Sequence, residues 1–176
     1  MLSLQLVVEP MSETAPNEYG WRVHSALDAW TGKVDTKASI ALAIESAVLG
    51  YVLNQTASGQ GLADLDGLRQ AGFYLGLGLL LAAVGCAVWV VFPRLRRRAS
   101  SREEEWARNT IYFGHLRHWD PEKLEAKLAE GAPVTGQLAR QLVKMAEIAW
   151  SKHVWLQASL VFLSLGVVCI LTVSAT

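Results

Sequence analysis

One acidic side chain in an apolar stretch is the most unusual chemical feature of this sequence. Glu45 lies in the middle of residues 38–53, which carry no other charge. A carboxylate at bilayer depth costs about 2.5–3.5 kcal/mol on insertion scales, so such acids usually face a bundle interior, a water-filled cavity or a partner. Two interpretations stay open for Glu45. It is a protonated, hydrogen-bonded structural group, or it belongs to an ion or water path with Ser39 and Ser46.

Two histidines could in principle bind a metal. His115 and His118 are three residues apart on an expected helix, and Asp120 and His153 could add ligands. The spacing is weaker than an HExxH arrangement and has no glutamate between the histidines, so a surface or interfacial pair is favoured. The chain also lacks a phosphate-binding glycine loop, a nucleophile elbow and a CxxC pair. We therefore expect no enzyme activity, no catalytic residue, no metal and no cofactor.

Three apolar stretches must position these side chains. Residues 71–92 carry no charge over 22 positions, and residues 154–173 carry none over 20. Both exceed the roughly 18 residues that indicate a membrane-spanning helix. Residues 38–53 form a weaker third stretch because Glu45 interrupts it. The sequence predicts an all-α integral membrane protein with transmembrane helices at residues 38–54, 71–93 and 154–174.

The distribution of positive charge predicts the orientation. Four arginines follow the second span, at positions 94, 96, 97 and 98, whereas the loop at residues 55–70 is nearly free of them. The positive-inside rule puts the arginines in the cytoplasm and the loop outside. The N-terminus is then cytoplasmic and the C-terminus external. Binding of a nucleic acid or anionic lipid is the alternative for these arginines, and we expect no nucleic-acid polymer as a partner.

The first and last spans are predicted to continue as long cytoplasmic helices. From Glu18, apolar residues recur every three or four positions and no breaker intervenes, so residues 18–37 should run into the first span. Thr135 can cap a helix that continues without a breaker to Val173. Residues 1–17 are expected to be disordered, and Met11 is a plausible start, which would make the first ten residues an extension.

A helical insert is predicted within the cytoplasmic region at residues 94–153. Ser101 opens a capping-box pattern, from which a helix should run through His118. Asp120 should cap a shorter helix, with proline at its first position, that Gly131 ends.

Small residues line one face of each of the first two spans. Such faces let membrane helices approach closely, and packing within the bundle is favoured over a pore role for the second span. The small face of the second span comprises Gly72, Gly76, Ala83 and Ala87. The small-polar face of the first comprises Asp35, Ser39, Ala43, Ser46, Gly50 and Asn54, opposite Ile40, Ile44, Val48 and Tyr51.

Three local sequence patterns occur in a fixed order along the chain. They are "WTGKVDTKASIAL" before and within the first span, "NTIYFGHL" in the insert, and "IAWSKHVWLQAS" before the last span. In this order they resemble the PycTM family, the transmembrane effectors of bacterial Pycsar antiphage systems, over about residues 20–174. The matching positions are Asp35, Lys37, Asn109, Tyr112, Phe113, His115 and Lys152.

The resemblance implies a function. In such systems a neighbouring cyclase makes cyclic CMP or cyclic UMP during infection, the effector impairs the bacterial inner membrane, and the cell dies before phage mature. The lipid bilayer and further copies of the chain are the implied partners, since three helices cannot enclose a path alone. The alternative is a scaffolding membrane protein whose helical bundle recruits a cytosolic partner.

A cyclic pyrimidine nucleotide needs donors for its phosphate charge, an aromatic face for its base and an amide for the base edge. An interhelical polar network in which Asp35 pairs with a lysine is the alternative use of these side chains. Within the insert, Phe113 is expected chiefly to pack, together with Trp106 and Leu116, and Tyr112 to signal. The candidate ligand-binding residues are Lys37, Asn109, Tyr112, His115 and Lys152.

Overall fold

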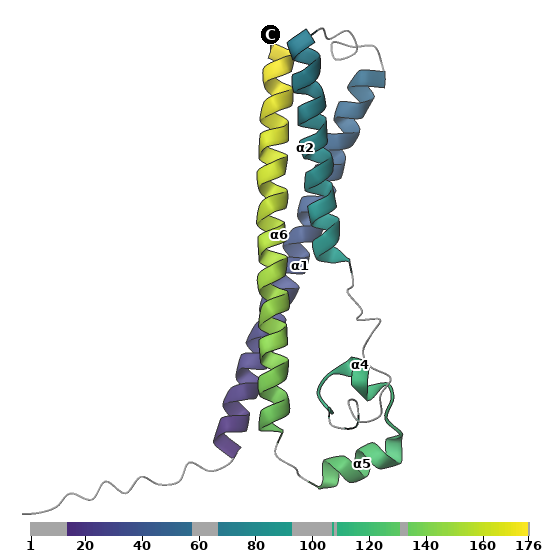
Figure 1. The fold of residues 1–176 in the computed structure, drawn as a ribbon, viewed down its shortest axis with the longest axis vertical. Coiled ribbons are helices and arrows are strands. Elements are labelled where there is room, and N and C mark those ends of the chain that lie inside the picture. Colours follow the sequence, from purple (N-terminus) through teal and green to yellow (C-terminus); the bar gives the residue numbers. More distant parts are fainter. Residues whose placement is uncertain (1–13, 58–66, 93–106, 108, 131–133, 176) are drawn as a thin grey trace, which may run out of the picture. The chain divides into compact units, whose positions relative to one another are not determined.

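The fold is built from helices, as the sequence predicts. The computed structural model describes residues 14–57, 67–92, 107, 109–130 and 134–175. Every regular element among these residues is a helix (Figure 1), which confirms the all-α prediction. The helices are α1 (Thr14–Ala57), α2 (Gly67–Val91), α4 (Phe113–Leu116), α5 (Pro121–Ala129) and α6 (Thr135–Ala175).

Three of these helices are long and apolar enough to cross a membrane: α1, α2 and α6. This confirms the three predicted spans and indicates a membrane protein. With 44 and 41 residues, α1 and α6 are about 66 and 62 Å long at 1.5 Å per residue. A bilayer core is only about 30 Å thick. Both helices therefore continue well beyond a span without a break, as predicted.

The chain divides into two compact units. The insert unit comprises Met1–Asp28 and Arg96–Ala146, and the span unit comprises Ala29–Leu95 and Glu147–Thr176. Each unit contains a part of α1 and a part of α6. Glu45 belongs to the span unit, whereas Tyr112 and His115 belong to the insert unit.

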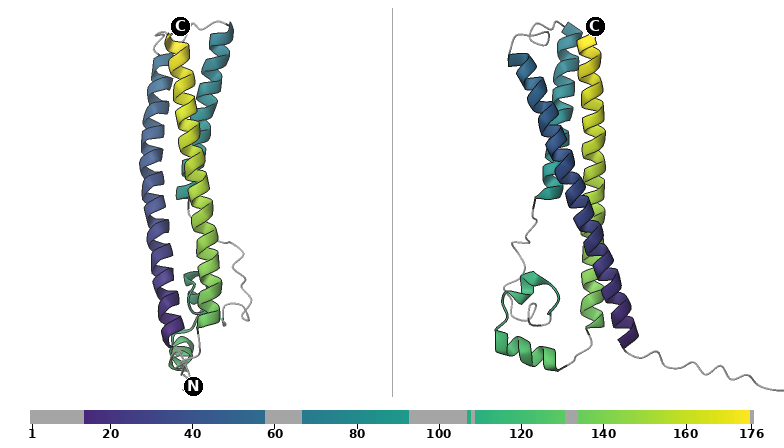
Figure 2. Two further views of the ribbon diagram at one scale, coloured as in Figure 1. Left: turned by 90° about the vertical axis from the view of Figure 1, so that its left-hand side faces the viewer. Right: turned by 180° about the vertical axis from the view of Figure 1, so that it is seen from behind.

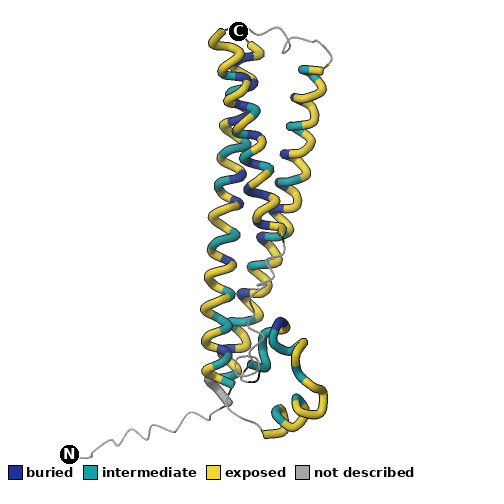
Figure 3. The backbone as a smooth tube through the Cα atoms, turned by 45° about the vertical axis from the view of Figure 1, so that its right-hand side comes forward, coloured by how far each residue is buried: buried dark blue, intermediate teal, exposed yellow. Residues whose placement is uncertain are grey.

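Within the span unit, α1 and α6 run in the same direction and α2 runs in the opposite one (Figures 1 and 2). Buried positions recur along the sides on which the three helices meet, and most other positions are exposed (Figure 3). Two apolar clusters hold this unit together. The Val52 cluster comprises Val52, Phe73, Leu80, Ile170 and Val173. The Val34 cluster comprises Val34, Ala38, Ala41, Val90 and Leu156.

The backbones of α2 and α6 approach closely through glycines. A Cβ added to Gly166 would lie 3.0 Å from the carbonyl oxygen of Gly76, and a Cβ on Gly76 would lie 3.2 Å from that of Gly166. At this level there is room only for the hydrogen atoms of glycine between the two helix backbones. Ala83 and Ala87, further along α2, are completely buried. The small stripe predicted on the second span therefore packs within the chain.

Apart from Asp35, the small-polar face of the first span is not the face that packs on its neighbours. Ala38, Ala41 and Glu45 on α1 are buried. Ser46 is exposed, and a Cβ on Gly50 would meet no atom within 4 Å. Exposed Ile40 and Ile44, elsewhere on the helix, suit contact with lipid.

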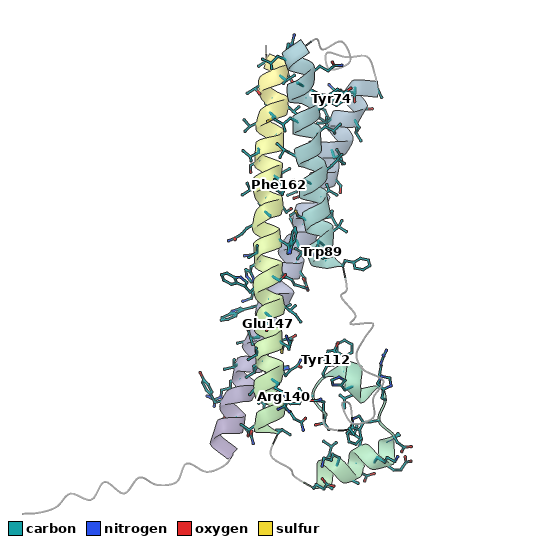
Figure 4. All side chains as sticks on the ribbon, viewed as in Figure 1. Tyr74, Trp89, Tyr112, Arg140, Glu147 and Phe162 are labelled. Carbon is teal, nitrogen blue, oxygen red and sulfur yellow. The ribbon has the colours of Figure 1, made fainter. Side chains whose placement is uncertain are left out.

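Exposed aromatic side chains lie near both ends of the spans. Tyr74 and Trp89 are close to opposite ends of α2 (Figure 4), and their exposed fractions are 61% and 50%. Trp89 meets Trp155 of α6 edge to face, with ring centroids 6.1 Å apart. Tyrosine and tryptophan favour the two membrane–water interfaces. These rings therefore mark levels where the bilayer would end.

The insert has less helix than predicted. A helix from Ser101 through His118 is wrong at residues 109–112, which are not helical. Tyr112 is extended, with φ −84° and ψ 122°, and only Phe113–Leu116 forms a helical turn after it.

A contact that is distant in sequence accounts for this break. Both the backbone N–H and the hydroxyl of Thr110 donate to Oε1 of Gln137 on α6, at 3.1 and 3.3 Å. Asn109, Thr110 and Ile111 are also poor helix formers. The backbone N–H of Thr110 therefore has a partner on α6 and does not need the hydrogen bond that a helix would give it.

The ends of α5 and α6 follow the predicted signals in part. Asp120 caps α5 by accepting a hydrogen bond from the N–H of Glu122 at 3.2 Å. Hydrogen bonds with Glu122, through its side chain and then its backbone, lower the pKa of Asp120 below its ordinary value. Thr135 is the first residue of α6 instead of its cap, and its hydroxyl donates to Oδ1 of Asn17 at 2.7 Å.

Several predictions concern residues outside the described ranges. These include the disorder of residues 1–13, the start at Met11, the arginines at positions 94–98 and the roles of Trp106 and Gly131. The expected disorder does not extend to residues 14–17, because α1 already begins at Thr14.

The close approach of α2 and α6 predicts opposite effects at two glycines of α2. In Gly76→Ala the methyl group would lie 2.8 Å from Cγ1 of Ile170, and such overpacking costs about 1–3 kcal/mol. Gly78→Ala meets no atom within 4 Å and should be neutral or stabilise by up to about 1 kcal/mol, because alanine is the better helix former. Thermal unfolding in detergent measures both. Equal melting temperatures for the two variants would contradict the close approach.

Candidate functional site

Glu45 lies inside the span unit, between the two apolar clusters along α1. Glu45 is completely buried, and so is Ser159 on α6. The Ser159 hydroxyl donates a hydrogen bond to Oε1 of Glu45. A buried polar group is tolerated when it is hydrogen-bonded. This contact therefore explains how α1 accommodates an acid at this depth.

The second carboxyl oxygen of Glu45 is unsatisfied. Oε2 is buried and has no hydrogen-bond partner among the described residues. Glu45 also takes part in none of the ion pairs found there. An unpaired charge is far more costly to bury than a neutral polar group. The surroundings thus suit a neutral acid that accepts a hydrogen bond at Oε1 and carries its proton on Oε2.

The structure separates Glu45 from the serines with which the sequence grouped it. Ser39 and Ser46 are exposed, whereas Glu45 is fully buried against the other helices. The Ser39 hydroxyl donates to the backbone carbonyl of Asp35, one turn earlier in the same helix, at 2.9 Å. Within a single chain the geometry therefore favours the hydrogen-bonded structural interpretation of Glu45 over a shared polar path.

Sequence reasoning missed Ser159. A serine in an apolar run is a weak signal, because serine is common in membrane helices and often bonds to its own backbone. One spacing could have drawn attention to it. Ser159 follows Lys152 by seven residues, or two helical turns, which places both on one face of α6. Both positions contact α1.

Asp35 and Lys152 form the second polar contact between α1 and α6. Lys152 Nζ lies 2.5 Å from Asp35 Oδ1, and the exposed fractions of the two side chains are 19% and 42%. By contrast, the ion pair between Glu18 and Arg22 lies within one helix. The pairing agrees with the predicted alternative in which Asp35 binds a lysine. Partly exposed pairs of this kind contribute about 0–1 kcal/mol.

The two candidate lysines are not brought together. Lys37 is exposed, and at two residues from Asp35 it projects to nearly the opposite side of α1. Lys152 is engaged by Asp35. Both lysines belong to the span unit, whereas Asn109, Tyr112 and His115 belong to the insert unit.

An aromatic cluster surrounds α4 in the insert unit, where Figure 4 marks Tyr112. The Tyr112 ring centroid lies 4.8 Å from that of Phe113 and 5.2 Å from that of His115, which it meets at 80°. Gly114 is buried beneath Tyr112, and a Cβ at this position would collide with the tyrosine ring. The short turn therefore fixes a tyrosine and a histidine side by side.

His115 carries a buried nitrogen without a partner. Nδ1 has no hydrogen bond within the described part of the chain. A buried polar atom left unsatisfied costs about 1–3 kcal/mol. A group that hydrogen-bonds to this nitrogen would recover that cost.

The burial of the two aromatic residues does not agree with the packing role expected of Phe113. Phe113, expected chiefly to pack, is 64% exposed. Tyr112, expected chiefly to signal, is half-buried over Gly114. The reason is local: the helical turn begins only after Tyr112, so the two rings do not follow one continuous helical face. Asn109 is half-buried and has an interaction partner within the protein.

The histidines do not assemble a metal site in the part of the chain described. No three His, Cys, Asp or Glu side chains among those residues are grouped so that they could hold a metal ion. His118 is exposed, and its Nε2 lies 3.2 Å from Nε of the neighbouring Arg117.

The family model PycTM, described as the Pycsar effector protein domain, matches residues 19–176. No curated protein and no solved structure matches the chain.

The Glu45–Ser159 contact predicts a specific loss of stability. Ser159→Ala would leave Oε1 of Glu45 without its donor, which should cost about 1–3 kcal/mol. Ser164→Ala is the matched control on α6, because the exposed Ser164 hydroxyl donates to the backbone carbonyl of Leu160 at 2.8 Å. Thermal unfolding in detergent should show a lower melting temperature for Ser159→Ala alone. Equal melting temperatures for the two variants would rule out the contact as a stabilising interaction.

Proposed function

The chain belongs to the PycTM family of Pycsar effectors, and from this membership we propose that it impairs the membrane on binding a cyclic pyrimidine nucleotide. Cyclic CMP or cyclic UMP, made by a neighbouring cyclase during phage infection, would be the signal. Death of the infected cell before phage mature would be the outcome. The family match over residues 19–176 carries this proposal, and the three helices able to span a membrane support it.

The proposed location is the bacterial inner membrane, with the N-terminus in the cytoplasm and the C-terminus outside. The arginines that follow the second span support this orientation through the positive-inside rule. It places the aromatic cluster around Tyr112 in the cytoplasm, where a cyclase would release its product. The scaffolding alternative makes the same use of the spans but needs no change in the membrane.

The proposed nucleotide contacts in the insert unit are Asn109, Tyr112 and His115. The tyrosine offers an aromatic face for a pyrimidine, and base–aromatic stacking is worth about 1–3 kcal/mol. The unsatisfied Nδ1 of His115 supports a further hydrogen bond. Asn109 supplies an amide that can read the base edge.

The proposal includes assembly of several copies. The exposed small-polar face of α1, with Ser39, Ser46 and Gly50, is not covered by any of the helices that the structure describes. Small residues let membrane helices approach closely. Such a face suits another copy better than it suits lipid. Light scattering of the protein in detergent, with and without nucleotide, measures the number of copies.

Purified protein in liposomes tests the function. We expect cyclic UMP or cyclic CMP to release an entrapped dye, and cyclic AMP, whose purine is larger, to release none. The readout separates the effector from a scaffold, because a scaffold leaves the vesicles intact. If neither pyrimidine nucleotide changes dye release at any concentration, the effector proposal is wrong.

Two histidine variants test the proposed contacts. His115→Ala should raise the nucleotide concentration for half-maximal release by about tenfold, the equivalent of one hydrogen bond of about 1.4 kcal/mol. His118→Ala, at the exposed histidine of the same segment, is the control and should respond like the wild type. Calorimetric titration with the nucleotide separates lost binding from lost membrane action. Equal responses from both variants would remove His115 from the site.

A further inference from the structure

The three helices of the span unit are joined in two different ways. Close glycine packing joins α2 and α6, where a Cβ on Gly76 or Gly166 would meet the opposite backbone. One hydrogen bond, from Arg69 to the backbone carbonyl of Val173 at 3.2 Å, adds to this packing. The glycines of α1 in this unit make no such contact, because a Cβ on Gly32 or Gly50 would meet no atom within 4 Å. Of the three, α2 and α6 therefore form the closely packed pair.

Polar contacts join α1 to α6. Lys152 pairs with Asp35 at 2.5 Å, and Ser159 donates to Glu45. The two acids are ten residues apart on α1, about 15 Å along the helix. The contacts thus hold α1 along much of its span instead of at a single point.

Lipid makes these polar contacts more decisive than the apolar ones. Lipid tails can replace apolar side chains at a helix surface, so association in a membrane depends on close packing and interhelical hydrogen bonds. Apolar residues of α1, such as Ala38 and Val52, can exchange neighbours for lipid at little cost. Glu45 cannot, because its carboxyl would enter hydrocarbon without a donor.

We infer that Asp35–Lys152 and Glu45–Ser159 together form a lock that holds α1 against α6 in the resting state, and that activation breaks it. This inference rests on the proposed effector function, for which it names the moving element. The pair α2–α6 stays together, and α1 moves away from α6 within the span.

Each half of the lock has a property that a releasable contact needs. The Asp35 side chain is 42% exposed, so an anion or a change in the neighbouring chain can compete for Lys152. Glu45 keeps one oxygen, Oε2, without a partner while the lock is closed. Water that enters as α1 moves would satisfy this oxygen. The closed state therefore keeps Glu45 hydrogen-bonded to Ser159 and leaves one carboxyl oxygen that only opening would satisfy.

Dye release from liposomes in the absence of nucleotide tests the lock. Ser159→Ala should raise the unliganded release rate by about fivefold or more, because it removes a buried hydrogen bond from the closed state. Asp35→Asn should raise it by up to about fivefold, because a partly exposed ion pair stabilises less. The charge swap Asp35→Lys with Lys152→Asp should return it toward the wild-type rate. Asp28→Asn on α1 and Ser164→Ala on α6 are exposed controls and should leave it unchanged.

Lock variants that stay as tight as their controls, or a charge swap that leaks as much as Asp35→Asn, would overturn the inference. If Ser159→Ala does not fold, Ser159→Thr keeps the hydroxyl and should stay closed, and the Asp35 variants then decide alone. A wild type that ignores both nucleotides would refute the proposed function but not the lock, because the unliganded rates still report on it.

Discussion

The hydrogen bond from Ser159 to Glu45 is the contact on which the arrangement of the spans depends. A carboxyl group inside an apolar bundle has few tolerable positions, since it needs a donor and cannot face lipid without cost. That requirement fixes the face that α1 turns toward α6. Ala38 and Ala41 are buried on the same face, and they are small enough to let the neighbouring helices come near. Rotating α1 to bury its small-polar face would place Glu45 elsewhere and leave it without Ser159.

The contact between α2 and α6 differs in kind from the contact between α1 and α6. Gly76 and Gly166 bring α2 and α6 together through backbone packing, and Arg69 adds a hydrogen bond to the backbone carbonyl of Val173. The contact of α1 with α6 contains a carboxylate, an ammonium group, a carboxyl group and a hydroxyl. Chemistry can act on such a contact. A fixed pair and a releasable helix are the combination that the proposed signal-dependent effector would need.

Much of the fold could be predicted because hydropathy and helix breakers are local signals. The second span follows from the 22 uncharged residues at 71–92. The long α6 follows from the absence of a breaker between Thr135 and Val173. The partner of Glu45 could not be predicted, because Ser159 is 114 residues away. The sequence of one helix does not determine its register against another. The break before Phe113 has a similar cause, since Gln137 draws Thr110 out of a helical path.

The protonation and hydrogen bonding of Glu45 can be read from the infrared absorption of its carboxyl group. Exposed acids are ionised at neutral pH, so a neutral carboxyl C=O band in the resting protein would come from a buried acid. We predict such a band, its loss in Glu45→Gln, and its shift to higher frequency in Ser159→Ala, because a carbonyl that loses a hydrogen bond vibrates faster. A resting protein with only carboxylate bands, or a carboxyl band that Ser159→Ala leaves in place, would contradict the account.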